Sequence, residues 1–182
     1  MYHIKITLLP LLQILFQKKK YLTKLLNFMN QKAEKVNNAS NLLKKFSTIF
    51  PDESHCLEML AELKWKDGFV CRHCGHTNWC HGKSVTSRRC TKCKREESAT
   101  AHTIFHHCKF SLNVAMKLSL LVCQIPDISS YELSRQVKIR HMTCYHFQKK
   151  LLVCQQGQPE NELLKELLKE MTKRLEHQTL II

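Results

Sequence analysis

The sequence predicts a small α+β protein in which short β-hairpins are followed by an all-α bundle. Residues 69–108 contain short apolar runs broken by Gly, Asn, Ser and paired cysteines, which is typical of small hairpins. Beyond Phe110 the apolar residues recur at helical spacing instead. With 182 residues and 43% hydrophobic content, the chain has room for one domain or two small ones around a real core.

The charge of the chain is strongly positive and unevenly distributed. Lys and Arg number 29 against 15 Asp and Glu, which gives a formal net charge of +14. Between Gly68 and Arg95 there are seven Lys or Arg and no carboxylate. Such a surplus favours a polyanionic partner, either a nucleic acid or an anionic membrane surface.

Residues 1–49 are predicted to form an apolar and Lys-rich N-terminal extension that is partly flexible. Residues 4–16 are mostly apolar, but they are shorter than the roughly 20 residues that span a bilayer. Three lysines follow the run and no small-residue cleavage site does, which argues against a signal peptide. The run is interpreted as a helix lying on another surface, or as sequence upstream of a true start at Met29. We expect a cytoplasmic, reducing location without membrane contact, where thiols can bind metal.

A short helix is predicted to begin at Pro51, with acids beside it, and to end by Trp65. Its apolar face consists of Cys56, Leu57, Leu60 and Ala61. A turn at Asp67-Gly68 then leads into the cysteine-rich segment, so residues 50–108 are taken as one unit.

Two Cys-x-x-Cys pairs are the most specific pattern in the chain. Cys71 and Cys74 are followed, after fifteen intervening residues, by Cys90 and Cys93. This spacing matches a four-cysteine zinc ribbon, in which four thiolates at about 2.3 Å fill a tetrahedron around one structural Zn²⁺. Substitution of Cys80, His76 or His81 as a ligand is the alternative, but these residues form no second pair and are kept as loop residues. The other five cysteines are predicted to be small core residues.

Residues 109–153 are predicted to form three helices. Ser111 can cap the first, which is apolar nearly all round and which Pro126 stops. Ser129 and Glu132 form a capping box for a helix of about two turns that ends at Val137. After a turn at residues 138–140, a third helix runs from His141 to about Leu152. Helix, short turn and helix form a helix-turn-helix pattern.

The third helix is predicted to bury Cys144, Phe147 and Leu151, so that its other face could enter a DNA major groove. We expect base contacts from Tyr145 and His146. Phosphate contacts are expected from cations of the ribbon and of this helix, namely Arg88, Arg89, Lys92, Lys94, Arg95, Arg140, Lys149 and Lys150.

Residues 154–182 are predicted to form an amphipathic C-terminal helix that Pro159 opens. Leu164, Leu168, Met171 and Leu175 lie at alternating four- and three-residue spacing, the seam of a short coiled coil. The helix would pack on the helical half or pair two chains as a homodimer. Two heptads are marginal for a stable dimer, which favours the intramolecular alternative.

The order of these motifs resembles a known family. The resemblance covers residues 48–153 and rests on Phe50-Pro51-Asp52-Glu53, Phe69-Val70-Cys71, Cys74-Gly75-His76, Cys90-x-x-Cys93 and Ser130-Tyr131-Glu132-Leu133. The run is similar to the N-terminal region of bacterial insertion-sequence transposases with a DDE-type catalytic domain. Compared with that family, His102 and His107 replace small residues, Ala115-Met116 replaces an aromatic, and Lys138 replaces a turn glycine.

The resemblance implies that ribbon and helix-turn-helix together recognise terminal inverted repeats in double-stranded DNA. The catalytic domain of that family uses acidic residues to hold two divalent metals and needs on the order of 100 residues. Only 29 residues follow Val153 and none is Asp, so no catalytic residue is predicted. The chain is interpreted as the DNA-binding portion of a truncated or split transposase, with a separately encoded catalytic subunit as a partner. A stand-alone transcriptional regulator and an RNA-binding zinc-ribbon protein are the alternatives.

Overall fold

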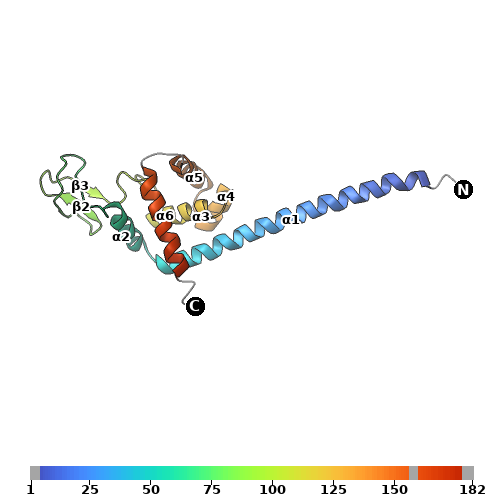
Figure 1. Ribbon diagram of the computed structural model, residues 1–182, viewed down its shortest axis with the longest axis horizontal. Coiled ribbons are helices and arrows are strands. Elements are labelled where there is room, and N and C mark those ends of the chain that lie inside the picture. The colour runs from blue at the N-terminus through green and yellow to red at the C-terminus, as the bar shows by residue number, and fades with distance from the viewer. Residues whose placement is uncertain (1–4, 156–159, 178–182) are drawn as a thin grey trace. The chain divides into compact units, whose positions relative to one another are not determined.

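The computed structural model describes the backbone of residues 5–155 and 160–177, and the side chains of residues 17–154 and 162–177 (Figure 1). By its internal contacts the chain separates into two compact units, the first ending at Asn38 and the second beginning at Ala39. The predicted helix start at Pro159 lies outside the described residues.

The first helix, α1, runs without interruption over Lys5–Ile49. The extension over residues 1–49, which was predicted to be partly flexible, is therefore helical from Lys5 to its end. The physical reason is that neither Gly nor Pro occurs between Pro10 and Pro51, so a change to polar composition does not end the helix. From Ala39 onward α1 contributes buried side chains to the second unit, including Phe46 and Ala39 itself. Within the described residues, no helix is long and apolar enough to cross a membrane.

The second helix, α2 (Glu53–Lys64), begins two residues after the predicted start at Pro51 and ends before Trp65 as predicted. Asp52 caps it, because its side chain accepts a hydrogen bond from the backbone N–H of His55 at 3.1 Å. Cys56, Met59 and Leu60 form its buried face. Its acidic first turn has a second use, since Glu53 accepts a hydrogen bond from the backbone N–H of Leu112 and so joins α2 to the start of α3.

A three-stranded antiparallel sheet follows, with the strands in the order β1, β2, β3. The strands are β1 (Trp79–His81), β2 (Ser87–Cys90) and β3 (Glu96–Ser98). In the register, Trp79 pairs with Cys90 and Arg88 pairs with Glu97. Helices precede and follow this small sheet along the chain, which confirms the predicted α+β class.

The helical half contains α3 (Leu112–Gln124), α4 (Ser130–Val137) and α5 (His141–Gln155). The two predicted caps are confirmed, because Ser111 accepts from Val114 and Ser129 accepts from Glu132. Lys138 ends α4 in the left-handed conformation, at φ 57° and ψ 40°. That conformation explains why a glycine fits this turn better than lysine does.

The last helix, α6 (Glu160–His177), packs within the chain against α2 and α3. Leu164, Leu167, Met171 and Leu175 are buried on its inner face. The predicted seam is therefore used in intramolecular packing, with Leu167 more deeply buried than Leu168.

Candidate metal centre and basic surface

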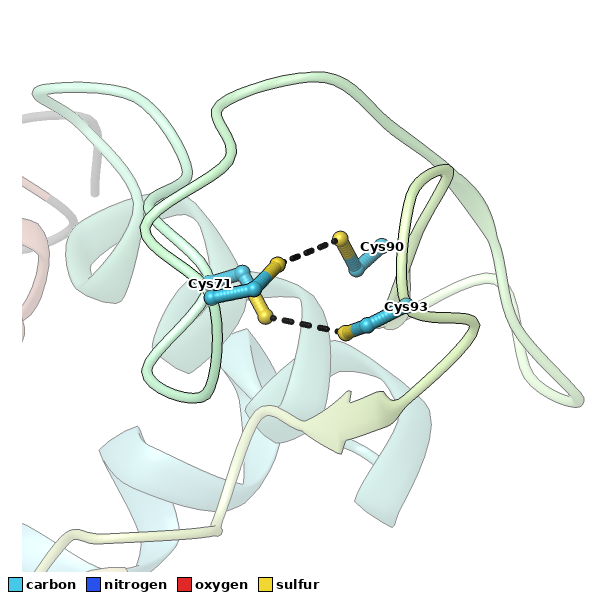
Figure 2. Close-up of side chains that lie close together, drawn as sticks. Cys71, Cys90 and Cys93 are labelled. Carbon is cyan, nitrogen blue, oxygen red and sulfur yellow. Dashed lines mark hydrogen bonds between the residues drawn. The ribbon is translucent and has the colours of Figure 1, made fainter.

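The four paired cysteines converge on one point. Their Sγ atoms all lie within 4.8 Å of one another, and they are the one such cluster among the described residues. Cys71 Sγ lies 3.5 Å from Cys93 Sγ, and Cys74 Sγ lies 3.6 Å from Cys90 Sγ. Figure 2 shows the sulfurs of Cys71, Cys90 and Cys93 turned toward each other across two loops. A tetrahedron with metal–sulfur bonds of about 2.3 Å has edges of about 3.8 Å, so the spacing fits Zn²⁺.

Two loops of the same backbone design hold the sulfurs. In the first, the N–H of Gly75 donates to the carbonyl of Cys71 at 2.8 Å, and in the second the N–H of Lys94 donates to that of Cys90 at 3.0 Å. Gly75 and Lys94 occupy the same place after their cysteine pairs, and both have positive φ, at 68° and 62°. Glycine adopts this conformation at no steric cost, whereas the second loop places a lysine, Lys94, in the same conformation.

The loops stabilise the anionic form of two of the four sulfurs. Hydrogen bonds from the backbone N–H groups of Cys93 and Lys92 lower the pKa of the Cys90 thiol to about 6, although burial acts in the opposite direction. The N–H of His73 likewise lowers the pKa of Cys71. The N–H of Arg95 acts in the same way on Cys93, but burial and the neighbouring thiols outweigh it and raise the pKa of Cys93 to about 11. Thiolates are the form that binds zinc, so the backbone around Cys71 and Cys90 favours the metal-bound state. Four thiolates complete the shell and leave no position for water, which makes this zinc structural.

The alternative ligands lie outside the cluster. His76 Nε2 lies 3.1 Å from the hydroxyl of Thr91, which donates to the carbonyl of Asn78, so this histidine links the two loops. Cys80 and His81 are exposed on β1 and contact carbonyl oxygens of Arg89 and Val85. The prediction that these three residues are not ligands is confirmed by the composition of the cluster, but Cys80 and His81 lie in a strand where loop residues were predicted.

Comparison with protein families agrees with this geometry. Residues 51–96 match the transposase zinc-ribbon domain. The match begins at the Pro51 turn, spans α2 and both cysteine pairs, and ends in β3. No curated protein and no solved structure matches the chain. The zinc ribbon is thus supported by the sulfur geometry and by the family, and it carries a structural zinc.

A buried cation fixes the zinc ribbon to α2, and sequence reasoning missed it. The ammonium of Lys64 reaches three acceptors: the Glu97 carboxylate at 2.7 Å and the carbonyls of Ser98 and Ala101 at 2.8 and 2.6 Å. The Lys64 side chain is 8% exposed and the Glu97 side chain 13%. Burial lowers the pKa of Lys64, and the bond to Glu97 opposes that shift. Lysine at the end of an amphipathic helix normally faces water, so the pattern carried no signal for this contact.

Arg88 occupies a different environment from the one the sequence predicted. Its guanidinium lies 4.5 Å from the ring centroid of Trp65 and 4.1 Å from that of Trp79, between the end of α2 and β1. The side chain is half-buried, and burial lowers its pKa. These contacts make Arg88 a packing residue of the zinc ribbon. Trp65 and Trp79 lie far from each other and from Arg88 in the sequence, so the spacing of these residues did not indicate the contact.

The other predicted ribbon cations are exposed. Arg89 donates through Nε to the carbonyl of Lys94 at 3.1 Å, which leaves its terminal N–H groups outward. Within the part of the chain that the structure describes, no hydrogen bond or ion pair engages the side chains of Lys92, Lys94 or Arg95. Glu96 and Glu97, which follow Arg95 directly, act within the sheet: Glu96 accepts from Ser87, and Glu97 pairs with Lys64.

The two helices α4 and α5 pack on each other and present part of the predicted surface. Cys144, Phe147 and Leu151 are buried as predicted, whereas His146, Lys149 and Arg140 are exposed. Tyr145 is half-buried, and the ammonium of Lys149 lies 4.7 Å from the centroid of the Tyr145 ring. Lys150 differs from the expectation, because its ammonium donates to the carbonyl of Ile104 at 2.6 Å and joins α5 to the loop before α3.

Proposed function

We propose that this chain binds double-stranded DNA as the DNA-binding portion of an insertion-sequence transposase. The match of residues 51–96 to the transposase zinc-ribbon domain carries the proposal. It is supported by the carboxylate-free run from Gly68 to Arg95, whose outward cations form a surface suited to phosphates. Element-end DNA is the proposed target.

The structure sharpens the list of proposed contacts. Arg88 and Lys150 have internal partners, so the phosphate contacts are assigned to the exposed cations Arg89, Lys92, Lys94, Arg95, Arg140 and Lys149. Tyr145 and His146 remain the proposed base contacts on α5. Phosphate contacts set affinity for any duplex, whereas base contacts set sequence preference, so the two groups predict different phenotypes.

Selection of bound duplexes from a random DNA pool tests this proposal. The zinc-loaded chain should enrich one sequence family, and the variant Tyr145→Ala/His146→Ala should alter the enriched sequence. The variant Lys92→Ala/Arg95→Ala should weaken binding to all duplexes alike. The matched control, Lys169→Ala/Lys173→Ala, removes the same charge from exposed positions of α6 and should bind like the wild type.

Two further outcomes separate the alternatives. Preferential binding of RNA in the presence of competing duplex DNA would contradict the proposal and favour an RNA-binding zinc ribbon. The proposal also holds that this chain supplies no strand-transfer chemistry, so no cleavage of element-end DNA is expected with Mg²⁺ or Mn²⁺. Metal-dependent cleavage by the pure chain that persists in the ribbon variants would contradict the proposed absence of strand-transfer chemistry.

A further inference from the structure

The first unit of the chain is a helix whose apolar face lies open. Tyr21, Leu22, Leu25, Leu26, Phe28 and Met29 are all exposed, with fractions between 43% and 67%. Large apolar side chains grouped in this way on one segment mark an interaction surface. Helices also gain most of their stability from the packing of such a face. The question is which partner covers it.

The spacing of the apolar residues identifies the kind of partner. From Leu8 to Val36 the first unit contains nine positions at alternating four- and three-residue steps, and eight of them are apolar. In order they are Leu8, Leu12, Leu15, Lys19, Leu22, Leu26, Met29, Ala33 and Val36. All nine lie within α1. An apolar 4–3 repeat sustained over about four heptads is the seam of a coiled coil, in which another helix of equal period provides the holes.

We propose that α1 pairs with α1 of a second copy of this chain as a parallel, in-register coiled coil. Taking Lys19 and Leu26 as a positions and Leu22 and Met29 as d positions, the apolar seam would be covered by an identical seam. Lys19 would then be the polar a residue within the apolar part of the seam. A single lysine at an a position lowers stability but specifies register and favours two strands.

The flanking charges select the parallel orientation. In a parallel pair each g residue faces the e residue five positions later in the partner helix, so Lys18 faces Thr23 and Lys32 faces Asn37 without like-charge contact. The like-charge contact of this pair is the one between Lys19 and Lys19 of the second copy, at the a position. In an antiparallel pair whose seams overlap over residues 12–36, g faces g, so Lys18 meets Lys32 of the second copy and Lys32 meets its Lys18. Two like-charge contacts against one disfavour this antiparallel arrangement.

The salt dependence of association distinguishes a second copy of α1 from an anionic surface as the partner. Residues 1–38 contain seven Lys and one Glu, so two copies repel each other over long range. Salt screens that repulsion and should therefore tighten the proposed dimer. Association with a phospholipid surface or with DNA has the opposite dependence, because salt weakens it. A parallel dimer would hold two copies of the DNA-binding unit at the same end, a consequence that rests on the proposed function.

Sedimentation equilibrium of the zinc-loaded full chain, without DNA, tests the pairing at 0.1 and 0.5 M salt. The expected result is twice the mass of one chain at tens of micromolar, with a lower dissociation constant at the higher salt. Leu22→Asp/Leu26→Asp places charge in the seam and should weaken association at least about 100-fold. The matched control, Asn27→Asp/Gln31→Asp, has the same spacing and charge on the opposite face and should remain dimeric. Unchanged zinc content in both variants shows that the second unit is intact.

Orientation is tested by energy transfer between dyes on the N-terminal amines of two copies. Parallel helices bring the amines together, whereas antiparallel helices separate them by roughly 50 Å over the length of the first unit. A monomer at tens of micromolar would overturn the proposal. So would a wild-type monomer that binds phosphatidylglycerol vesicles, with binding lost in Leu22→Asp/Leu26→Asp, since the lipid surface would then be the partner. A stable dimer that does not bind DNA would instead contradict only the proposed function.

Discussion

Two adjacent arginines of β2 should have opposite roles, although the sequence presents them as equivalent. Arg88 lies between the rings of Trp65 and Trp79, and Arg89 points outward. Each cation–π contact of a partly desolvated guanidinium is worth about 1 kcal/mol. Arg88→Ala should therefore lower the free energy of unfolding by about 2 kcal/mol. Arg89→Ala removes one exposed hydrogen bond to the Lys94 carbonyl, so it should lower that free energy by less than about 1 kcal/mol and should reduce DNA affinity.

The assay uses the zinc-saturated chain and urea denaturation. Trp65 and Trp79 are the only two tryptophans of the chain and both contact Arg88, so their fluorescence reports directly on this site. Arg88→Lys is the matched control, because it keeps the charge but loses the planar group that fills the space between two rings. It should recover about half of the loss. Equal stability of Arg88→Ala and Arg89→Ala, or equal effects on DNA affinity, would refute the reasoning.

Four other changes test the remaining parts of the account by the same denaturation assay or by metal analysis. Lys64→Met should cost about 3 kcal/mol, because it leaves the Ala101 carbonyl without its partner and leaves the part-buried Glu97 carboxylate only the Arg72 contact at 3.8 Å. Lys66→Met, at an exposed pair, should change little. Gly75→Ala should cost about 1 kcal/mol through backbone conformation alone, since no atom lies within 4 Å of an added Cβ, and Lys94→Gly should have the opposite sign. Ser129→Ala should destabilise the chain by about 1 kcal/mol through loss of the α4 cap. Cys90→Ser should lower zinc content well below one ion per chain, and full retention would contradict the ligand set.

Local patterns with a stated physical cause were predictable from the sequence. The cysteine spacing predicted the metal cluster because each Cys-x-x-Cys turn lets its two sulfurs converge on one ion. The helix starts at Ser111 and Ser129 followed from caps that act within three residues. Leu164 and Met171 were placed on the buried face of α6 by helical period.

Contacts between distant segments were not predictable in the same way. The partners of Lys64 come from β3 and the loop after it, and the partner of Lys150 comes from the loop before α3. Such contacts depend on how the elements pack, and a surface lysine and a buried one look alike in sequence. The helicity of the polar part of α1 was not predictable from composition, because polar residues occur both in exposed helices and in flexible segments.

The most direct test of the central proposal is the salt dependence of duplex DNA binding by the zinc-loaded chain. Six exposed cations are assigned to phosphates, so log K against log salt should fall with a slope of roughly −5 for each bound chain. Removal of Arg89 and Lys92 should reduce the slope by about 2, and chelation of zinc should abolish the ribbon's share. A slope near zero, or one unaltered by both changes, would contradict the assignment of this surface to DNA.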